Sequence, residues 1–223
     1  LNADEFITIT NEKLRNSGNP DAAFPTPIPG LENQFYDTDW QSVILRTAFQ
    51  QNHALSMSGA NEKTNYFFSL GFANMDGIIR PNSLQRYTFR TRVEQKAFEN
   101  RLTIGVNSSV ANTINRSLNV SGNALSGNIE GAIFGFPNVP VRWPDGFYNL
   151  SADQSSLGQG ANTRPIRGNY TNQAYVIDNN IFKNQQLNLN GNAFADLQII
   201  EGLNARTQIG INYLLGEDYL YYA

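Results

Sequence analysis

The chain contains no cysteine and only one histidine, His53, among its 223 residues. Disulfide bonds and thiolate metal sites are therefore excluded. A multi-histidine metal site or a histidine-dependent catalytic triad would need partners that the sequence does not supply around His53. We expect no cofactor, no metal and no covalent chemistry, so a surface hydrolase is the least favoured class.

Charge is also scarce. Charged residues make up 16% of the chain, the net charge is −3 and the pI is near 5.2. This charge balance gives no indication of a basic surface that would bind nucleic acid. No run of about 18 apolar residues is present, which excludes a membrane-spanning helix.

Amide, hydroxyl and glycine residues replace the missing charges. Hydrophobic residues reach 40%, yet the mean hydropathy is −0.40, because Asn, Gln, Ser, Thr and Gly make up much of the remainder. Such a composition disfavours a cytosolic α/β enzyme. It is typical of outer-membrane barrels and of some extracellular β proteins.

Two segments near the end of the chain, 185–198 and 203–213, alternate with a period of two residues. Their apolar or small positions are Leu187, Leu189, Gly191, Ala193, Ala195, Leu197, Leu203, Ala205, Ile209, Ile211 and Tyr213; the intervening positions are mostly Asn, Gln, Asp or Arg, with Phe194 as an exception. The pattern predicts a hairpin with one apolar and one amide-rich face. A soluble sandwich would pack the apolar face on a second sheet, whereas a transmembrane barrel would expose it to lipid.

Four more strands are predicted earlier in the chain, within 46–59, 64–74, 84–95 and 101–110. The last three share the same alternation, with Phe67 as another exception. The turns between strands alternate between short (61–63, 96–100, 199–202) and long (75–83, 112–182). Short periplasmic turns and long external loops are characteristic of outer-membrane barrels.

The remaining segments are predicted as helix or loop. Asn2 and Glu5 predict a capping box at the start of a helix over 2–16. Residues 17–39 are predicted as a proline-rich loop. Apolar spacing from Leu125 to Phe136 predicts a helix inside the long connection. Asp76-Gly77 and Asp145-Gly146 lack calcium-ligand spacing and are predicted as turns.

About six strands cannot close a barrel, because the smallest bacterial barrels have about eight. The chain is therefore expected to be part of a longer barrel protein; Leu1 is not an initiator, and we expect further residues before it. The alternative is a soluble extracellular β-sandwich that binds glycans. Carboxylate pairs such as Asp37/Asp39 and Glu217/Asp218 are expected to be solvated loop ends.

A series of short strings in one order resembles the early barrel of the SusC/RagA family of TonB-linked outer-membrane transporters. The strings are Thr38-Asp39-Trp40-Gln41, Arg46-Thr47, Gln51-Asn52, Leu55-Ser56-Met57-Ser58-Gly59, Glu62-Lys63-Thr64-Asn65-Tyr66, Gly71-Phe72, Gly77-Ile78-Ile79 and Arg86-Tyr87. The resemblance implies a 22-stranded barrel with a plug in the outer membrane of a Gram-negative bacterium. It also implies energising by TonB-ExbB-ExbD through an absent N-terminal part, a SusD-like surface lipoprotein as lid, and import of an oligosaccharide or peptide.

The expected organisation is an all-β, antiparallel transmembrane barrel segment. It comprises an external loop with a short helix (1–37), four barrel strands (38–113), a long external loop (114–181) and two barrel strands (182–223). Trp143, Phe147 and Tyr148 in the long loop are candidates for contact with cargo or lid. Six residues are predicted to face the lumen: Arg86, Arg90, Arg92, Asn188, Asn190 and Arg206. Tyr219, Tyr221 and Tyr222 are predicted to form part of an interfacial aromatic girdle.

Overall fold

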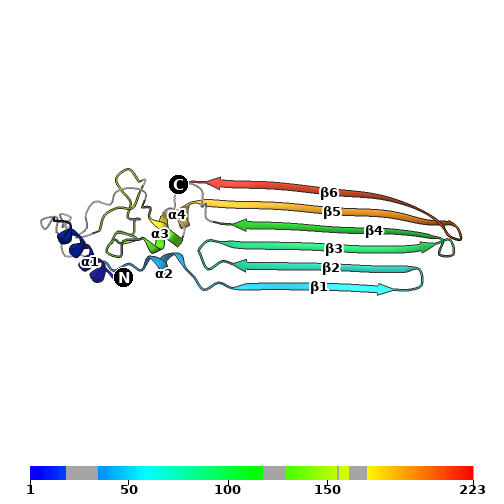
Figure 1. The fold of residues 1–223 in the computed structure, drawn as a ribbon, viewed down its shortest axis with the longest axis horizontal. Coiled ribbons are helices and arrows are strands. Elements are labelled where there is room, and N and C mark those ends of the chain that lie inside the picture. The colour runs from blue at the N-terminus through cyan, green and yellow to red at the C-terminus, as the bar shows by residue number, and fades with distance from the viewer. Residues whose placement is uncertain (19–34, 118–128, 155, 161–169, 223) are drawn as a thin grey trace.

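The computed structural model describes residues 1–18, 35–117, 129–154, 156–160 and 170–222. Its strands form one antiparallel sheet in the order β1-β2-β3-β4-β5-β6. In Figure 1 the sheet extends away from the helices and loops, which gather at one end. No helix in the described part of the chain has the length and apolar character needed to cross a membrane.

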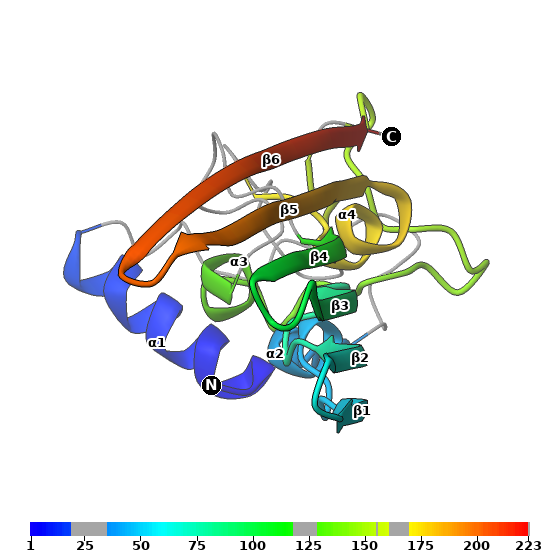
Figure 2. The same cartoon turned by 90° about the vertical axis from the view of Figure 1, so that its right-hand side faces the viewer.

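The six predicted strands are confirmed, but most are longer than the alternation indicated. Their bounds are Gln50–Ala60 (β1), Thr64–Asp76 (β2), Ser83–Ala97 (β3), Leu102–Arg116 (β4), Ile181–Ile200 (β5) and Leu203–Tyr221 (β6). β4 continues six residues past 110, and β6 continues eight past 213. Seen end-on in Figure 2, β5 and β6 sweep across the direction of β1–β3, as the right-handed twist of sheets requires.

The register keeps the two faces of the sheet chemically distinct. Paired residues share a face, and side chains alternate along each strand. One face carries Leu55, Met57, Phe68, Leu70, Phe89, Val93, Ile104, Val106, Val110, Leu187, Leu189, Ile209 and Ile211. We call it the apolar face. Ile209 is 75% exposed and Leu55 is 71% exposed, so no described residue covers them.

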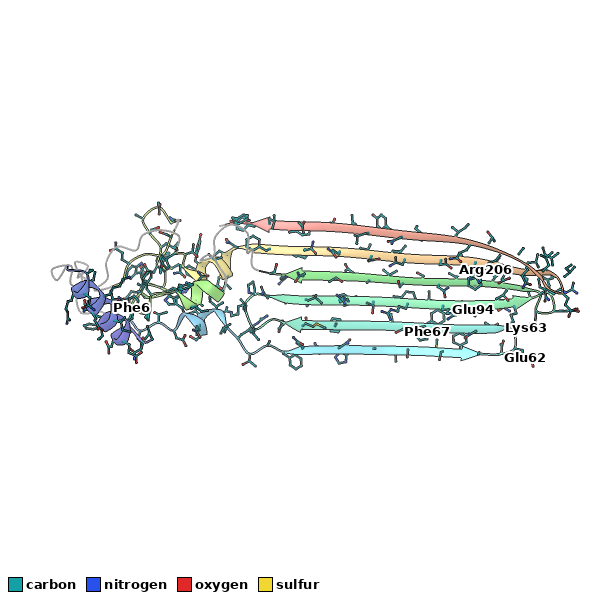
Figure 3. All side chains as sticks on the ribbon, viewed as in Figure 1. Phe6, Glu62, Lys63, Phe67, Glu94 and Arg206 are labelled. Carbon is teal, nitrogen blue, oxygen red and sulfur yellow. The ribbon has the colours of Figure 1, made fainter. Side chains whose placement is uncertain are left out.

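The tight turns lie at the end of the sheet opposite the helices. Asn61 accepts hydrogen bonds from the amides of Lys63 and Thr64, at 2.9 and 2.6 Å, and so closes the first turn. The β5–β6 turn uses Gly202 at φ +83°, a conformation that other residues rarely adopt. Figure 3 shows the charged residues Glu62, Lys63, Glu94 and Arg206 toward this end.

The helices of the described residues lie at the other end of the sheet. They are α1 (Ala3–Asn16), α2 (Trp40–Ile44), α3 (Ile129–Ile133) and α4 (Gln173–Asn179). The predicted capping box of α1 is confirmed, because Asn2 Oδ1 accepts from the Glu5 amide at 2.9 Å and Glu5 Oε2 accepts from the Asn2 amide at 3.1 Å.

The strand predicted within 46–59 is β1, which begins at Gln50, after α2 with its cap at Asp39. Two other sequence predictions in this region change. The helix predicted from Leu125 is described only as the short α3, and Leu125 itself lies outside the described residues. α4 lies in a segment predicted as loop. Most of the proline-rich loop, 19–34, also lies outside the described residues.

The helices and loops share a small hydrophobic core. Its buried members are Trp40, Ile44, Ala132, Val139, Leu157 and Ile177. The Trp40 indole N–H donates to the Phe136 carbonyl at 2.8 Å, which joins α2 to the segment after α3. The core therefore fixes α2, α3 and α4 together at the loop end of the sheet.

Candidate functional site

The second face of the sheet, which we call the polar face, carries all six residues predicted to face a lumen. Arg90 pairs in register with Ser109, Ser109 with Asn190, and Asn190 with Asn212. Arg86, Arg92, Asn188 and Arg206 occupy positions of the same parity in their strands. Residues far apart in sequence thus form one continuous polar surface.

Three of the four arginines predicted to face the lumen have a polar or charged partner among the described residues, and the fourth, Arg90, does not. Arg92 pairs with Glu94 at 2.6 Å, and the Arg86 guanidinium donates to Thr113 Oγ1 at 3.4 Å. Arg206 lies 3.8 Å from Asp196. Within the described part of the chain, Arg90 has no ion pair, so its guanidinium is open to a ligand.

A shallow hollow of about 540 Å³ lies in the polar face around Arg90. Its lining includes Phe67, Arg90, Arg92, Asn107, Asn190 and Asn212. Guanidinium and amide groups donate hydrogen bonds to carboxylate, hydroxyl and carbonyl oxygens, and the Phe67 ring adds an apolar contact. The hollow is suited to binding oxygen-rich molecules. Among its described lining residues there is no pair of carboxylates suited to acid-base catalysis.

Phe194 interrupts the alternation because it covers a gap in the neighbouring strand. Its ring lies over Gly105, where a Cβ atom would collide with it. The Arg206 guanidinium in turn lies 4.6 Å from the centre of the Phe194 ring. An aromatic residue that covers a glycine on the adjacent strand compensates for the missing side chain, so Phe194 supports the polar face locally.

The three aromatic candidates of the long loop differ in their surroundings. Phe147 is 74% exposed, whereas Trp143 and Tyr148 are half-buried. The predicted turn at Asp145-Gly146 is confirmed: the Gly146 amide donates to the Trp143 carbonyl at 2.9 Å, and Gly146 has φ +91°. The turn leaves Phe147 as the aromatic side chain most open to a partner.

Tyr148 belongs to an ionic cluster that the sequence did not reveal. Its hydroxyl donates to Asp178 Oδ2 at 2.6 Å, and the Arg142 guanidinium lies 3.6 Å from the centre of its ring. Arg80 and Arg142 both pair with Asp178, at 3.6 and 3.7 Å. The cluster joins the β2–β3 loop, the long loop and α4.

Burial raises the pKa of Tyr148 above its usual 10.0, and the hydrogen bond and negative charge of Asp178 raise it further, while Arg142 opposes them. A raised pKa favours the neutral phenol in the folded state. The stabilisation is present below pH 10 and is lost as the pH rises through the folded pKa.

We expect Asp178→Asn to lower the pKa of Tyr148 by removing the carboxylate's charge and its hydrogen bond to the phenol. The folded loop should then lose less stability in alkali. Difference absorbance of the tyrosinate, taken between each protein and its Tyr148→Phe derivative, measures this pKa. Asp153→Asn, elsewhere in the same loop, is the control. An unchanged pKa in Asp178→Asn would contradict the cluster.

No group of three or more His, Asp or Glu residues suited to a metal ion occurs within the described ranges. His53 lies on the apolar face. The centre of its ring is 6.4 Å from the centre of the Phe72 ring, the two rings are nearly parallel, and its Nε2 is 3.2 Å from Gln51 Oε1.

Comparison with known proteins finds relatives that are all named as TonB-dependent receptors. TonB-dependent receptor P26 of Formosa agariphila is 30% identical over 149 residues, covering 67% of this chain and 14% of the receptor. TonB-dependent receptor SusC of Bacteroides thetaiotaomicron is 32% identical over 80 residues, covering 36% of this chain and 8% of that protein. The chain thus spans less than a fifth of the length of these relatives. No family model matches it.

Solved structures share the fold. The RagAB peptide importer in the 'closed-closed' state matches with a TM-score of 0.62 at 23% identity, covering 96% of this chain and 23% of the solved chain. The structure of the RagAB peptide transporter matches with a TM-score of 0.60 at 22% identity and the same coverage. Sequence and fold together identify this chain as a SusC/RagA-like piece of a TonB-dependent receptor.

Proposed function

We propose that this chain forms part of the wall of an outer-membrane barrel that imports a nutrient by a TonB-dependent mechanism. The observation that carries the proposal is the register, which separates the apolar and polar faces across all six strands. The apolar face would contact lipid, and the polar face would line the lumen.

The height of the apolar face supports this proposal. Along β5, its alternating apolar positions run from Leu187 to Leu197. Ten residues of strand rise about 33 Å, and a tilt of about 40° reduces this to about 25 Å along the membrane normal. That distance equals the apolar band of outer-membrane barrels, about 25 Å.

The sandwich alternative requires a second sheet against the apolar face. The described strands belong to one sheet, and Ile209 and Ile211 remain 75% and 59% exposed. An exposed apolar surface of this extent is unfavourable in water. A lipid environment removes that cost, which favours the barrel.

The proposed cargo is an oligosaccharide or a peptide. The polar hollow, with Arg90 open and amides around it, offers hydrogen bonds to hydroxyl, carbonyl and carboxylate oxygens alike. The RagAB structures are described as those of a peptide importer, which supports the peptide alternative. Since Tyr148 is engaged with Asp178, we propose Phe147 and Trp143 as the residues that contact cargo or lid.

The proposed whole protein is a 22-stranded barrel with a SusD-like surface lipoprotein as lid, driven by TonB-ExbB-ExbD. In it, segments 1–37 and 114–181 are external, and the strands within 38–113 and 182–223 belong to the wall. The placement of α1–α4 at one end of the sheet, opposite the tight turns, supports this orientation.

Cysteine labelling of the full-length receptor in outer membranes tests the proposal, since this chain has no cysteine of its own. Any cysteine elsewhere in the receptor would first be replaced by serine. We expect Asn190→Cys to react with a charged, water-soluble maleimide and Leu189→Cys to be protected until detergent is added. Adjacent positions on opposite faces make the pair a matched comparison. Equal labelling of both residues without detergent would refute the face assignment.

A further inference from the structure

We propose that Arg116, Lys183 and Tyr219 form a binding site for a phosphate group of an outer-leaflet glycolipid. These residues form a row across β4, β5 and β6 at the loop end of the apolar face, which we call the cationic rim. The inference rests on the proposed function, because it takes the apolar face to be in contact with lipid.

The register places the three residues side by side. Arg116 is the partner of Lys183, and Lys183 is the partner of Tyr219. The Lys183 ammonium lies 4.9 Å from the centre of the Tyr219 ring, which confirms that these two side chains share a face. Two cations and a tyrosine thus lie next to one another at the loop end of the sheet.

Neither cation is neutralised within the described part of the chain. No described carboxylate lies within ion-pair distance of Arg116 or Lys183. The acid nearest in register, Glu217, accepts a hydrogen bond from the Tyr219 hydroxyl at 3.1 Å. Asp76, in the same outer row but on β2, pairs with Arg46 at 3.3 Å. Both rim cations are therefore available to an anion.

The depth of the rim fits a lipid headgroup. Lys183 precedes Leu187, where the unbroken alternation of apolar residues on β5 begins, by four residues. Four residues rise about 13 Å along the strand, or about 10 Å along the membrane normal at a tilt of about 40°. Basic side chains extend to the interface from such positions while their aliphatic parts cover apolar surface.

The chemistry selects a phosphorylated glycolipid. The planar guanidinium of Arg116 can donate two hydrogen bonds to one phosphate, and Lys183 adds a point charge. Tyrosine is enriched at this level of membrane proteins because its ring is amphipathic. Free inorganic phosphate would meet the same cations but would gain nothing from the apolar positions beneath them, which can contact acyl chains.

The experiment uses the full-length receptor in dodecyl maltoside micelles and fluorescent bis-phosphorylated lipid A as the probe. We expect the double variant Arg116→Gln/Lys183→Gln to bind this probe about thirtyfold more weakly, since each basic residue near an anionic surface contributes about fivefold. Dephosphorylated lipid A should bind both proteins equally weakly. Excess inorganic phosphate should compete poorly with the intact lipid.

The control is Lys63→Gln/Arg101→Gln, which removes two positive charges from the tight-turn end and should leave binding unchanged. Equal binding of phosphorylated and dephosphorylated lipid A, or equal losses in the two double variants, would overturn the proposal. Full displacement by inorganic phosphate would also overturn it, in favour of a free-anion site. If the rim variant does not fold, the unchanged receptor still tests the proposal, because it should bind phosphorylated lipid A more tightly than dephosphorylated lipid A. A folded receptor that passes the cysteine-labelling test but fails here refutes only the rim.

Discussion

Ile209→Arg should destabilise the barrel by about 2–4 kcal/mol, because it places a charge near the middle of the lipid-facing band. Ile209 is 75% exposed on the apolar face and pairs with Ala193, which is close to the midpoint between Leu187 and Leu197. In water, a substitution at so exposed a position would be nearly neutral. The large expected loss therefore comes from lipid alone.

Asn212→Arg is the matched control. It lies on the same strand, three residues away, but on the polar face opposite Asn190. We expect this variant to assemble normally and to keep the stability of the unchanged receptor, because a charge on the polar face stays in water. Heat-modifiable migration of the full-length variants, with urea titration in lipid vesicles, measures assembly and stability. Equal loss in both variants, or tolerance of both, would contradict the assignment of the two faces.

The central part of each strand was predictable because alternation is a local signal. In β5, the spacing from Leu187 to Leu197 fixed the strand and the face of each residue. The ends were not predictable, because alternation weakens there: β6 carries Leu214 and Leu215 in succession, yet both belong to the strand. Hydrogen bonding to the neighbouring strand extends the ladder where side-chain pattern gives no indication.

Part of the candidate site was also predictable from the sequence, and part was not. Arg90 and Asn190 were assigned to one face by parity, and the register brings them onto the same surface through Ser109. The Asp178 cluster was not predictable, because its partner Arg80 is distant in sequence and belongs to a different loop. α4, which carries Asp178, is only seven residues long and lies in an asparagine-rich segment with weak helix propensity. Such contacts depend on tertiary structure, for which a single sequence carries no periodic signal.

Trp40→Ala should open the loop core, at a cost of about 3–5 kcal/mol for removal of a buried tryptophan. Trp40 is 3% exposed, and its indole donates to the Phe136 carbonyl at 2.8 Å. Its ring also lies against Gly135, where no Cβ atom would fit. The substitution therefore leaves a cavity and removes one of the two hydrogen bonds to the Phe136 carbonyl, which still accepts from the Val139 amide.

Hydrogen exchange in the full-length receptor measures this effect locally, because the barrel strands are expected to unfold separately. The amides of Thr38 and Val139, which donate to the carbonyls of Pro137 and Phe136 at 2.6 and 3.1 Å, should lose protection in Trp40→Ala. Amides in β5 should keep theirs. Phe134→Ala, at a 58% exposed position beside the core, is the control and should change neither. Unaltered exchange at Val139 in Trp40→Ala would show that the loops are held by the strands rather than by their own core. Loss of protection in β5 as well would show instead that the loop core also stabilises the barrel strands.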